Sequence, residues 1–378
     1  MKPEGLWVVL KNYADMKILM LNEIKDWGGG EVLTLDLASA LVKKGVDLTL
    51  GCNKKSVLAD RAKEQDIPVI EFPMRNELDI FAVIFISGLI QKQKFDIIHT
   101  HTMRDHVLGS LAAKQSRKCA SVRTQHIHFP ENPSFMAQLA YKRWTDVIVC
   151  NSDFIKKDLE KAGIAPDLLK VVHNGVDFGR LREDPVSIRK EFSIPEDAIV
   201  IGCAGSLFKT KGQEYLIKAF PEIISKFPGA YILIAGDGGE RKNLEAMAKD
   251  TQNGGKIIFA GKRNDMANIM KSIDLMVVPS IWEEPFGLVN VESMYSGIPV
   301  IATRTGGIPE IITHNETGIL IPPKNEKAIA EAVINLLENK ELYNNIKTAA
   351  KEKASEYFDS KRMANDMVRV YEGVVKGK

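Results

Sequence analysis

Short apolar runs alternate along the chain with longer amphipathic stretches. In the first half such runs occupy residues 17–22, 46–50, 68–72, 95–100, 120–124 and 146–151. A second series occupies residues 198–206, 231–238, 256–261, 274–280, 298–303 and 317–323. Strands that alternate with helices are typical of βαβ units on a parallel sheet. The pattern therefore predicts an α/β protein with one doubly wound domain in each half of the chain.

The stretches between the predicted strands have helical spacing. Apolar residues between 32 and 42 recur on one face, and Lys43-Lys44-Gly45 favours a helix end there. In the second half, an apolar stripe recurs at Leu216, Phe220, Ile223, Ile224 and Phe227. Residues 356–375 are typical of one long terminal helix.

The length of 378 residues favours two domains over one, because single hydrophobic cores rarely grow that large. Residues 173–192 mix glycine, proline and charge, so we place the hinge there. We predict a first domain at 1–185, a second at 186–358 and a terminal helix at 359–378. Residues 1–15 are expected to form a short extension ahead of the fold, because the fold could begin equally well at Met16.

Composition and charge exclude several classes of protein. The chain is 45% hydrophobic and 26% charged, as soluble globular proteins are. Residues 1–185 carry 26 basic and 24 acidic side chains and the remainder 25 of each, which argues against a nucleic-acid binder. The four cysteines are scattered, which favours a reducing, cytoplasmic location. The apolar run at 80–90 is too short to span a membrane.

Gly28-Gly29-Gly30 follows the first predicted strand and opens a helix. Glycines there let backbone amides and the helix dipole approach an anion, although a tight turn without a ligand has the same sequence. A dinucleotide-binding fingerprint does not fit, because Leu33 stands where its last glycine is required. No Walker motif is present either.

Two carboxylates and a lysine follow strands of the second half. Lys211 precedes Gly212 and a helix, where a compact cation can neutralise a pyrophosphate. Glu284 and Glu292 stand eight positions apart, and carboxylates suit pairs of sugar hydroxyls. The free amides of the intervening turn, residues 286–288, would meet a phosphate. The alternatives are that Lys211 is an ordinary surface lysine, that Glu284 is a helix-dipole partner and that Glu292 is a solvated charge.

Histidines follow two strands of the first half, in HTH at 99–101 and QHIH at 125–128. A neutral imidazole there would hydrogen-bond a sugar or an acceptor hydroxyl. The alternative is a histidine that only stabilises the fold, and this applies more to His99, His101 and His128 than to His126.

Taken together, GGGEVLTLDLA, VVHNGVD, KGQEYLIKAF, IAGDGGE, EEPFGLVNVESMYSGIPVIATRTGGIPEII and TGILIPP resemble one family. They are similar to the retaining nucleotide-sugar glycosyltransferases of GT-B architecture, family four. The resemblance spans about residues 16–375 and is densest from 205 to 323. It implies two Rossmann-like domains facing across a cleft, the first binding the acceptor and the second the donor. It also implies a C-terminal helix that crosses back to the first domain.

The resemblance also assigns roles to residues. It places Glu284 on hydroxyls of the transferred sugar, Glu292 on the ribose, Lys211 on the pyrophosphate and His126 on the acceptor side. The phosphates would lie against the turn that contains the remaining predicted donor-binding residues, Phe286, Gly287 and Leu288. In the first domain, the family's GGxE loop is matched by Gly28, Gly29 and Glu31.

One residue departs from the family pattern. Ser206 stands where the family usually has an arginine, so a bidentate phosphate clamp worth roughly 1.5–3 kcal/mol is lost. Lys209 or Arg263 would have to substitute. Without a substitute, donor binding would be weak.

The resemblance implies a retaining transfer of sugar from a UDP, GDP or ADP donor to a hydroxyl of a glycan or glycolipid. The pathway it suggests is cell-surface polysaccharide or lipopolysaccharide biosynthesis. The chain contains no DxD motif, so we expect neither a metal nor another cofactor, and the departing phosphate would accept the acceptor proton. Two alternatives remain: a nucleotide-sugar-binding protein without transferase activity, suggested by Ser206, and a GT-B epimerase or phosphorylase.

Peripheral contact with the inner face of a membrane is a further expectation. The apolar run at 80–90 and the basic residues Lys114, Arg117, Lys118, Lys142 and Arg143 would support it. The alternative, which we favour from the sequence, makes the run a core helix and the cations ordinary surface.

Overall fold

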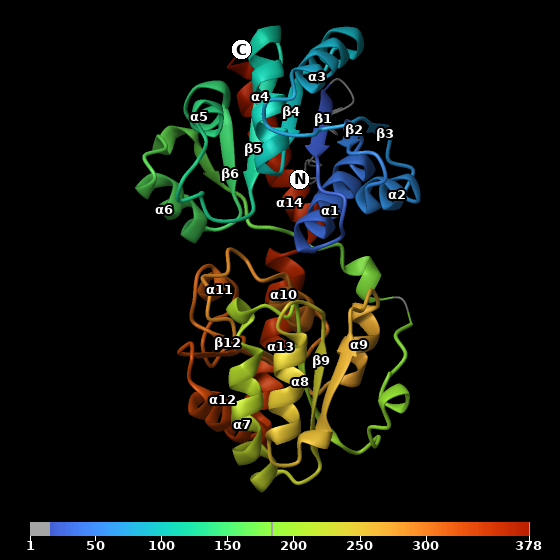
Figure 1. Ribbon diagram of the computed structural model, residues 1–378, viewed down its shortest axis with the longest axis vertical. Coiled ribbons are helices and arrows are strands. Elements are labelled where there is room, and N and C mark those ends of the chain that lie inside the picture. Colours follow the sequence, from blue (N-terminus) through green and yellow to red (C-terminus); the bar gives the residue numbers. More distant parts are fainter. Residues whose placement is uncertain (1–15, 183, 378) are drawn as a thin grey trace, which may run out of the picture. The chain divides into compact units, whose positions relative to one another are not determined.

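The computed structural model describes residues 16–182 and 184–377, so the predicted extension at 1–15 lies outside the described residues (Figure 1). The chain divides into two compact units, each built on one parallel sheet. The first unit contains residues up to Cys150, Leu159–Val172 and the chain from Ala364 onward. The second contains Asn151–Asp158 and His173–Met363. The α/β class expected from the alternating pattern is confirmed.

The first sheet has the strand order β3-β2-β1-β4-β5-β6-β7. In chain order its strands are β1 (Lys17–Asn22), β2 (Asp47–Cys52), β3 (Val69–Glu71), β4 (Ile97–Thr100), β5 (Ala120–Gln125), β6 (Val147–Cys150) and β7 (Leu169–Val171). The last of these was not predicted, because three residues of mixed burial give no periodic signal. The strand order reverses between β1 and β4.

Helices surround this sheet, and their ends follow local sequence rules. They are α1 (Gly29–Lys43), α2 (Val57–Lys63), α3 (Ile80–Gln93), α4 (Met103–Ser116) and α5 (Phe135–Leu139), with a π-helical turn at Ala140–Trp144. Thr102 and Asp105 form a capping box at the start of α4, which satisfies amides that have no partner inside the helix. Asp79 caps α3 by accepting from the amide of Ala82.

The second sheet has the order β10-β9-β8-β11-β12-β13, and all six of its strands were predicted. Its strands are β8 (Ile199–Ala204), β9 (Ala230–Ala235), β10 (Ile257–Gly261), β11 (Leu275–Val278), β12 (Val300–Thr303) and β13 (Ile319–Ile321). The order reverses between β8 and β11. In doubly wound sheets, ligands bind beyond the carboxyl ends of the strands at such a reversal, which we call the switch point.

The second unit also contains most of the helices from residue 153 onward. They are α6 (Asp153–Lys161), α7 (Gln213–Lys226), α8 (Arg241–Asp250), α9 (Met266–Ser272), α10 (Leu288–Tyr295), α11 (Ile308–Ile311), α12 (Glu326–Glu338) and α13 (Lys340–Tyr357), although the last three residues of α6 belong to the first unit. The predicted stripe of α7 is buried at Leu216, Phe220, Ile223 and Ile224, and it forms part of the core.

Residues 173–182, 184 and 185 belong to the second unit, whereas we predicted that the first domain would extend to residue 185. The reason is that Val176, Phe178 and Leu181 are buried in the core of the second unit. Glycine, proline and charge mark this segment as irregular, but they do not show which core its few apolar residues join.

The predicted terminal helix is two helices, because α13 ends at Tyr357 and α14 (Ser360–Lys376) begins after a break. At the break, the amide of Val176 donates to Phe358 O at 2.8 Å, and the amide of Ser360 donates to Val176 O at 3.1 Å. From Ala364 onward, α14 belongs to the first unit, as the predicted crossing requires. None of the helices in the described part of the chain combines the length and apolarity needed to span a membrane.

Candidate functional site

Two loops meet at the switch point of the second sheet. One follows β8 and carries Lys211, and the other follows β11. Gly212 joins them closely: its φ is 68°, and a Cβ on it would lie 2.1 Å from the carbonyl oxygen of Pro279. The amide of Ile281 donates to Thr210 O at 2.9 Å. A side chain at position 212 would therefore separate the two loops.

The loops bring Lys211 and Glu284 into direct contact, as the sequence predicted for residues of one site. The ammonium of Lys211 donates to Glu284 Oε1. The hydroxyl of Ser280, which the sequence analysis did not identify, donates to the same oxygen at 2.7 Å. Glu284 is only 7% exposed, so its charge is stabilised by these two donors rather than by water. This contradicts the alternative that Glu284 serves only as a helix-dipole partner.

Glu292 is also buried, at 5% exposed, so it is not the solvated charge of the alternative interpretation. Arg180 Nη2 donates to its Oε1 at 2.6 Å. The turn that carries Arg180 packs on α10, because the rings of Phe178 and Tyr295 stack with centroids 3.7 Å apart. Arg180 was not predicted, because it lies in the segment that was expected to be a hinge.

The start of α10 lies between the two glutamates in sequence. Gly287 is its N-cap, with φ 86°, and Leu288 is its first helical residue. Pro285 and Phe286 precede this cap and lie outside the helix. The first amides of a helix lack partners inside the helix and carry partial positive charge, which suits a phosphate. The predicted turn of Phe286, Gly287 and Leu288 thus has the geometry of an anion site flanked by carboxylates.

Gly306 packs directly against the backbone of Glu284. Its φ is 53°, and a Cβ there would lie 2.2 Å from the carbonyl oxygen of Glu284 and 2.6 Å from its amide nitrogen. We therefore expect Gly306→Ala to displace Glu284 and to lower the free energy of unfolding by about 2–4 kcal/mol, from backbone strain and overpacking. Urea unfolding checks this. A Cβ on Gly239 would meet nothing within 4 Å, so Gly239→Ala is the control and should change stability by less than about 0.5 kcal/mol. Equal effects would contradict this account of Gly306.

Ser206 is exposed, and its carbonyl accepts from the side-chain amide of Gln213 at 3.1 Å. Of its two suggested substitutes, Arg263 is already bound by Asp265 at 2.6 Å and by Glu191 at 2.6 Å. Those hydrogen bonds raise the pKa of the Arg263 guanidinium. A donor phosphate would have to compete with both carboxylates, so exposed Lys209 is the better remaining candidate.

In the first unit, Gly28 is the N-cap of α1 and follows β1 at the switch point of that sheet. A Cβ on Gly29 or Gly30 would meet nothing within 4 Å, so packing does not require glycine at either position. Glu31 is 8% exposed. Burial raises the pKa of its carboxyl, against hydrogen bonds from the loop backbone and from Asn22. The loop therefore presents an open backbone, the geometry that an anion requires.

His101 follows β4 and His126 follows β5, and the two form a pair at the carboxyl ends of these neighbouring strands. His101 Nδ1 and His126 Nε2 lie 2.9 Å apart, and the two rings stack. Burial, with a contribution from the charge of Arg123, lowers the pKa of His126 to about 4. His126 is therefore neutral at physiological pH, the form that can accept or donate a hydrogen bond to a hydroxyl.

His99 serves the fold instead. Its Nε2 lies 2.7 Å from Thr124 Oγ1, and its Nδ1 lies 2.7 Å from the hydroxyl of Tyr371 on α14. Burial lowers the pKa of His99 to about 3. Both ring nitrogens have partners and the side chain is fully buried, so the structural interpretation of His99 is confirmed.

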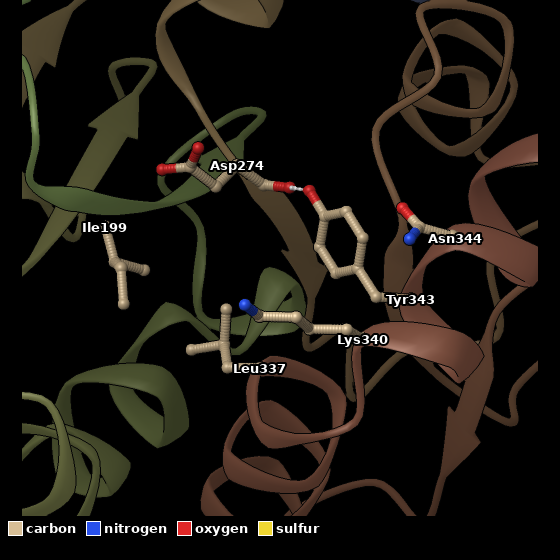
Figure 2. Close-up of a pocket in the computed structure, with 6 residues that line it drawn as sticks. All are labelled: Ile199, Asp274, Leu337, Lys340, Tyr343 and Asn344. Atoms are coloured by element: carbon tan, nitrogen blue, oxygen red, sulfur yellow. Dashed lines mark hydrogen bonds between the residues drawn. The ribbon is translucent and has the colours of Figure 1, made fainter.

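The second unit also has a hollow of about 280 Å³ (Figure 2). It is lined by Ile199, Asp274, Leu337, Lys340, Tyr343 and Asn344. Ile199 begins β8 and Asp274 precedes β11, so the hollow lies at the amino ends of the strands, opposite to Lys211. Tyr343 donates its hydroxyl to the backbone oxygen of Asp274 at 2.6 Å. Ligand sites usually measure roughly 300–1,000 Å³, and we assign no ligand to this hollow.

Asp153, His173 and Glu310 are close enough to hold a metal ion. However, the carboxylate of Glu310 accepts from the amides of Asp153 and Phe154 at 2.9 and 2.8 Å, and His173 Nε2 lies 2.9 Å from it. These contacts satisfy the first amides of α6. The cluster is therefore explained as a helix cap.

Comparison with known proteins yields two family matches. Residues 27–180 match the model described as Glycosyltransferase Family 4, and residues 186–353 match the one described as Glycosyl transferases group 1. The two matched segments together include every candidate residue described above.

Several individual proteins are similar over most of the chain. An uncharacterized glycosyltransferase of Methanocaldococcus jannaschii is 30% identical over 75% of this chain and 77% of its own length. The lipopolysaccharide core biosynthesis glycosyltransferase LpsE of Rhizobium meliloti is 28% identical over 90% and 93%. Among solved structures, HepE of Anabaena in complex with UDP has 26% identity, a TM-score of 0.83 and coverage of 95% and 100%. HepE has also been solved with UDP-glucose.

Proposed function

Because this chain belongs to the glycosyl transferases group 1, in glycosyltransferase family four, we propose that it is a retaining enzyme using a UDP-sugar. The sugar is transferred to a hydroxyl group of a glycan or glycolipid. HepE, which is similar over 95% of the chain, has been crystallised with UDP and with UDP-glucose. That similarity supports UDP over the GDP and ADP donors that the sequence left open.

The observation that carries the proposal is the pair of buried carboxylates beside the start of α10. Glu284 is held by Lys211 and Ser280, and Glu292 is held by Arg180. Burying two carboxylates at one edge of a sheet is unfavourable unless they are paired. The arrangement offers carboxylates for sugar and ribose hydroxyls, and a cation and helix amides for the diphosphate.

The reaction follows from which groups this site offers. The acceptor oxygen forms a bond to the anomeric carbon while the bond from that carbon to the phosphate oxygen breaks. The leaving phosphate keeps the electron pair and takes the acceptor proton, on the same face of the sugar. Lys211 and the first amides of α10 stabilise the negative charge that develops on the phosphate. This route requires neither a protein nucleophile nor a metal.

On the acceptor side, His126 hydrogen-bonds the acceptor or the transferring sugar. His101 fixes its ring through the 2.9 Å contact. The similarity to LpsE supports a glycan or glycolipid acceptor in the synthesis of lipopolysaccharide or another surface polysaccharide.

The donor is tested by a thermal-shift screen of UDP-, GDP- and ADP-glucose on the wild type and on Glu292→Ala. We expect only the UDP compound to stabilise the wild type, by about 2.7 kcal/mol at a hundred times its dissociation constant. Glu292→Ala should lose this shift, because the ribose loses its carboxylate. The neighbouring exposed Glu283 gives the control Glu283→Ala, which should keep the shift. A shift with GDP- or ADP-glucose alone, or an unchanged shift in Glu292→Ala, would refute the assignment.

A further inference from the structure

One helix of the first unit is apolar on the face that it turns to solvent. On α3, the side chains of Ala82, Val83, Ile86 and Ile90 are buried, as a core helix requires. Yet Ile80 is 64% exposed, Phe81 73%, Ile84 62% and Phe85 43%. The interpretation of residues 80–90 as a core helix is thus right for only one face. Helices on protein surfaces normally carry polar residues on the face that they turn to solvent.

The exposed side chains form one continuous surface. At 100° per residue, Ile80, Phe81, Ile84 and Phe85 fall within one arc of about 140°, and exposed Gly88, Gln91 and Lys92 continue it. Leu78, which directly precedes the helix, is 72% exposed. We call these five apolar residues, Leu78 with the four on α3, the α3 patch. Large exposed apolar patches mark interaction sites rather than ordinary surface.

Cations follow the α3 patch toward the C-terminal end of α3 and occur at the end of α4, and acids are scarce. Residues 80–95 and 106–119 contain no aspartate or glutamate. They contain five cations, all exposed: Lys92, Lys94, Lys114, Arg117 and Lys118. Helices α3 and α4 lie side by side (Figure 1) and pack on each other, and Ser87 Oγ donates to Gln115 at 3.2 Å. These cations therefore lie on, or just after, two neighbouring helices.

The two acids that adjoin Leu78 in sequence already have partners. Asp79 is buried and accepts from the amides of Arg75 and Ala82. Glu77 accepts from the hydroxyl of Ser134 at 2.6 Å. Exposed Arg75 adds a cation before the helix, so both ends of α3 carry positive charge.

This charge pattern decides between two occupants of the α3 patch. A symmetric contact with a second copy of the chain would place the patch against itself. Whether the two helices ran parallel or antiparallel, exposed cations at their ends would meet cations of the other copy. An anionic bilayer surface instead attracts the cations while its acyl region takes up the apolar side chains.

From this combination we propose that the α3 patch and its basic rim form a docking surface for anionic lipid bilayers. Helix α3 lies along the membrane plane, with its first two turns in the interfacial region and Lys92 and Lys94 on lipid phosphates. Helix α3 follows the carboxyl end of β3, and His126 follows the carboxyl end of β5 in the same parallel sheet. The proposal is independent of the proposed function, because lipid binding requires no donor.

Flotation with vesicles tests the proposal on the full chain. Vesicles of phosphatidylcholine alone are compared with vesicles containing about 30% phosphatidylglycerol, at low and at high salt. We expect flotation only with the anionic vesicles and a decrease with salt, because screening weakens lysine contacts with lipid. The double variant Phe81→Ser with Ile84→Ser should lower the partition coefficient at least tenfold. Lys92→Gln with Lys94→Gln should lower it about fivefold for each lysine.

Val186→Ser is the matched control, because Val186 is 68% exposed and belongs to the second unit. It should bind vesicles as the wild type does. Absence of wild-type flotation at low salt, or equal binding by the Phe81/Ile84 variant, would overturn the proposal. So would a concentration-dependent dimer in sedimentation that the Phe81/Ile84 variant abolishes, because the occupant would then be a second copy.

Discussion

Lys211→Ala is expected to lower turnover of a UDP-sugar by about a hundredfold to a thousandfold. The substitution removes the cation that stabilises charge on the leaving phosphate, and loss of one such donor typically raises a barrier by about 2.7–4 kcal/mol. It also leaves Glu284, only 7% exposed, with the Ser280 hydroxyl but without its cation. Steady-state kinetics with UDP release as the readout measures the effect.

Lys218→Ala is the control for this substitution. Lys218 lies on α7 and pairs with Glu214 at 2.8 Å on the surface, so it shares the residue type but not the site. Turnover of Lys218→Ala should stay within about twofold of the wild-type value. Turnover of Lys211→Ala within threefold of the wild type would contradict the role assigned to Lys211.

The first unit is expected to lose stability as pH falls below 6.5. Burial lowers the pKa of His99 to about 3, whereas an unfolded histidine titrates near its usual 6.5. Above pH 6.5 the side chain is neutral in both states, so its contribution is constant. Below 6.5 the unfolded chain binds a proton that the folded chain does not, so stability is lost until the folded pKa is reached. Between pH 6.5 and 5 this amounts to about 2 kcal/mol for His99 alone.

Other buried groups modify this dependence. Burial also lowers the pKa of His101 and of His106, so both add to the loss. Asp105 acts in the opposite direction, because burial raises its pKa to about 7 and the folded state then binds the proton first. Asp105→Asn should therefore steepen the decline in urea-unfolding free energy between pH 6.5 and 5. Unfolding free energy that is flat over that interval in both proteins would contradict the prediction.

The sequence predicted the strands well because buried parallel strands are continuous apolar runs. All six strands of the second sheet were found, but β7 was missed because exposed Lys170 interrupts its apolar residues. Propensity could not locate the break before α14, because this break is defined by backbone hydrogen bonds with Val176, which is distant in sequence. The domain boundary was misplaced for the same reason, because it depends on the core in which Phe178 packs.

The sequence motifs predicted Lys211, Glu284 and Glu292 as members of the candidate site, but not the residues that hold them. Glu284 and Lys211 contact each other, as residues of one site should, and Glu292 is buried beside the start of the same helix. Ser280 and Arg180 were missed, because each acts through a partner that only the folded chain brings near. The exposed face of α3 was also misjudged, since apolar content alone does not show which residues of a helix face solvent. The assigned roles of the site residues remain predictions.

The stereochemistry of donor cleavage tests the central claim most directly, and it requires no knowledge of the acceptor. With UDP-glucose and water as a slow substitute acceptor, proton NMR of the anomeric signal identifies the glucose formed before mutarotation. Attack on the face from which the phosphate departs predicts α-glucose as the first product, with an equal amount of UDP. The appearance of β-glucose first would contradict the account.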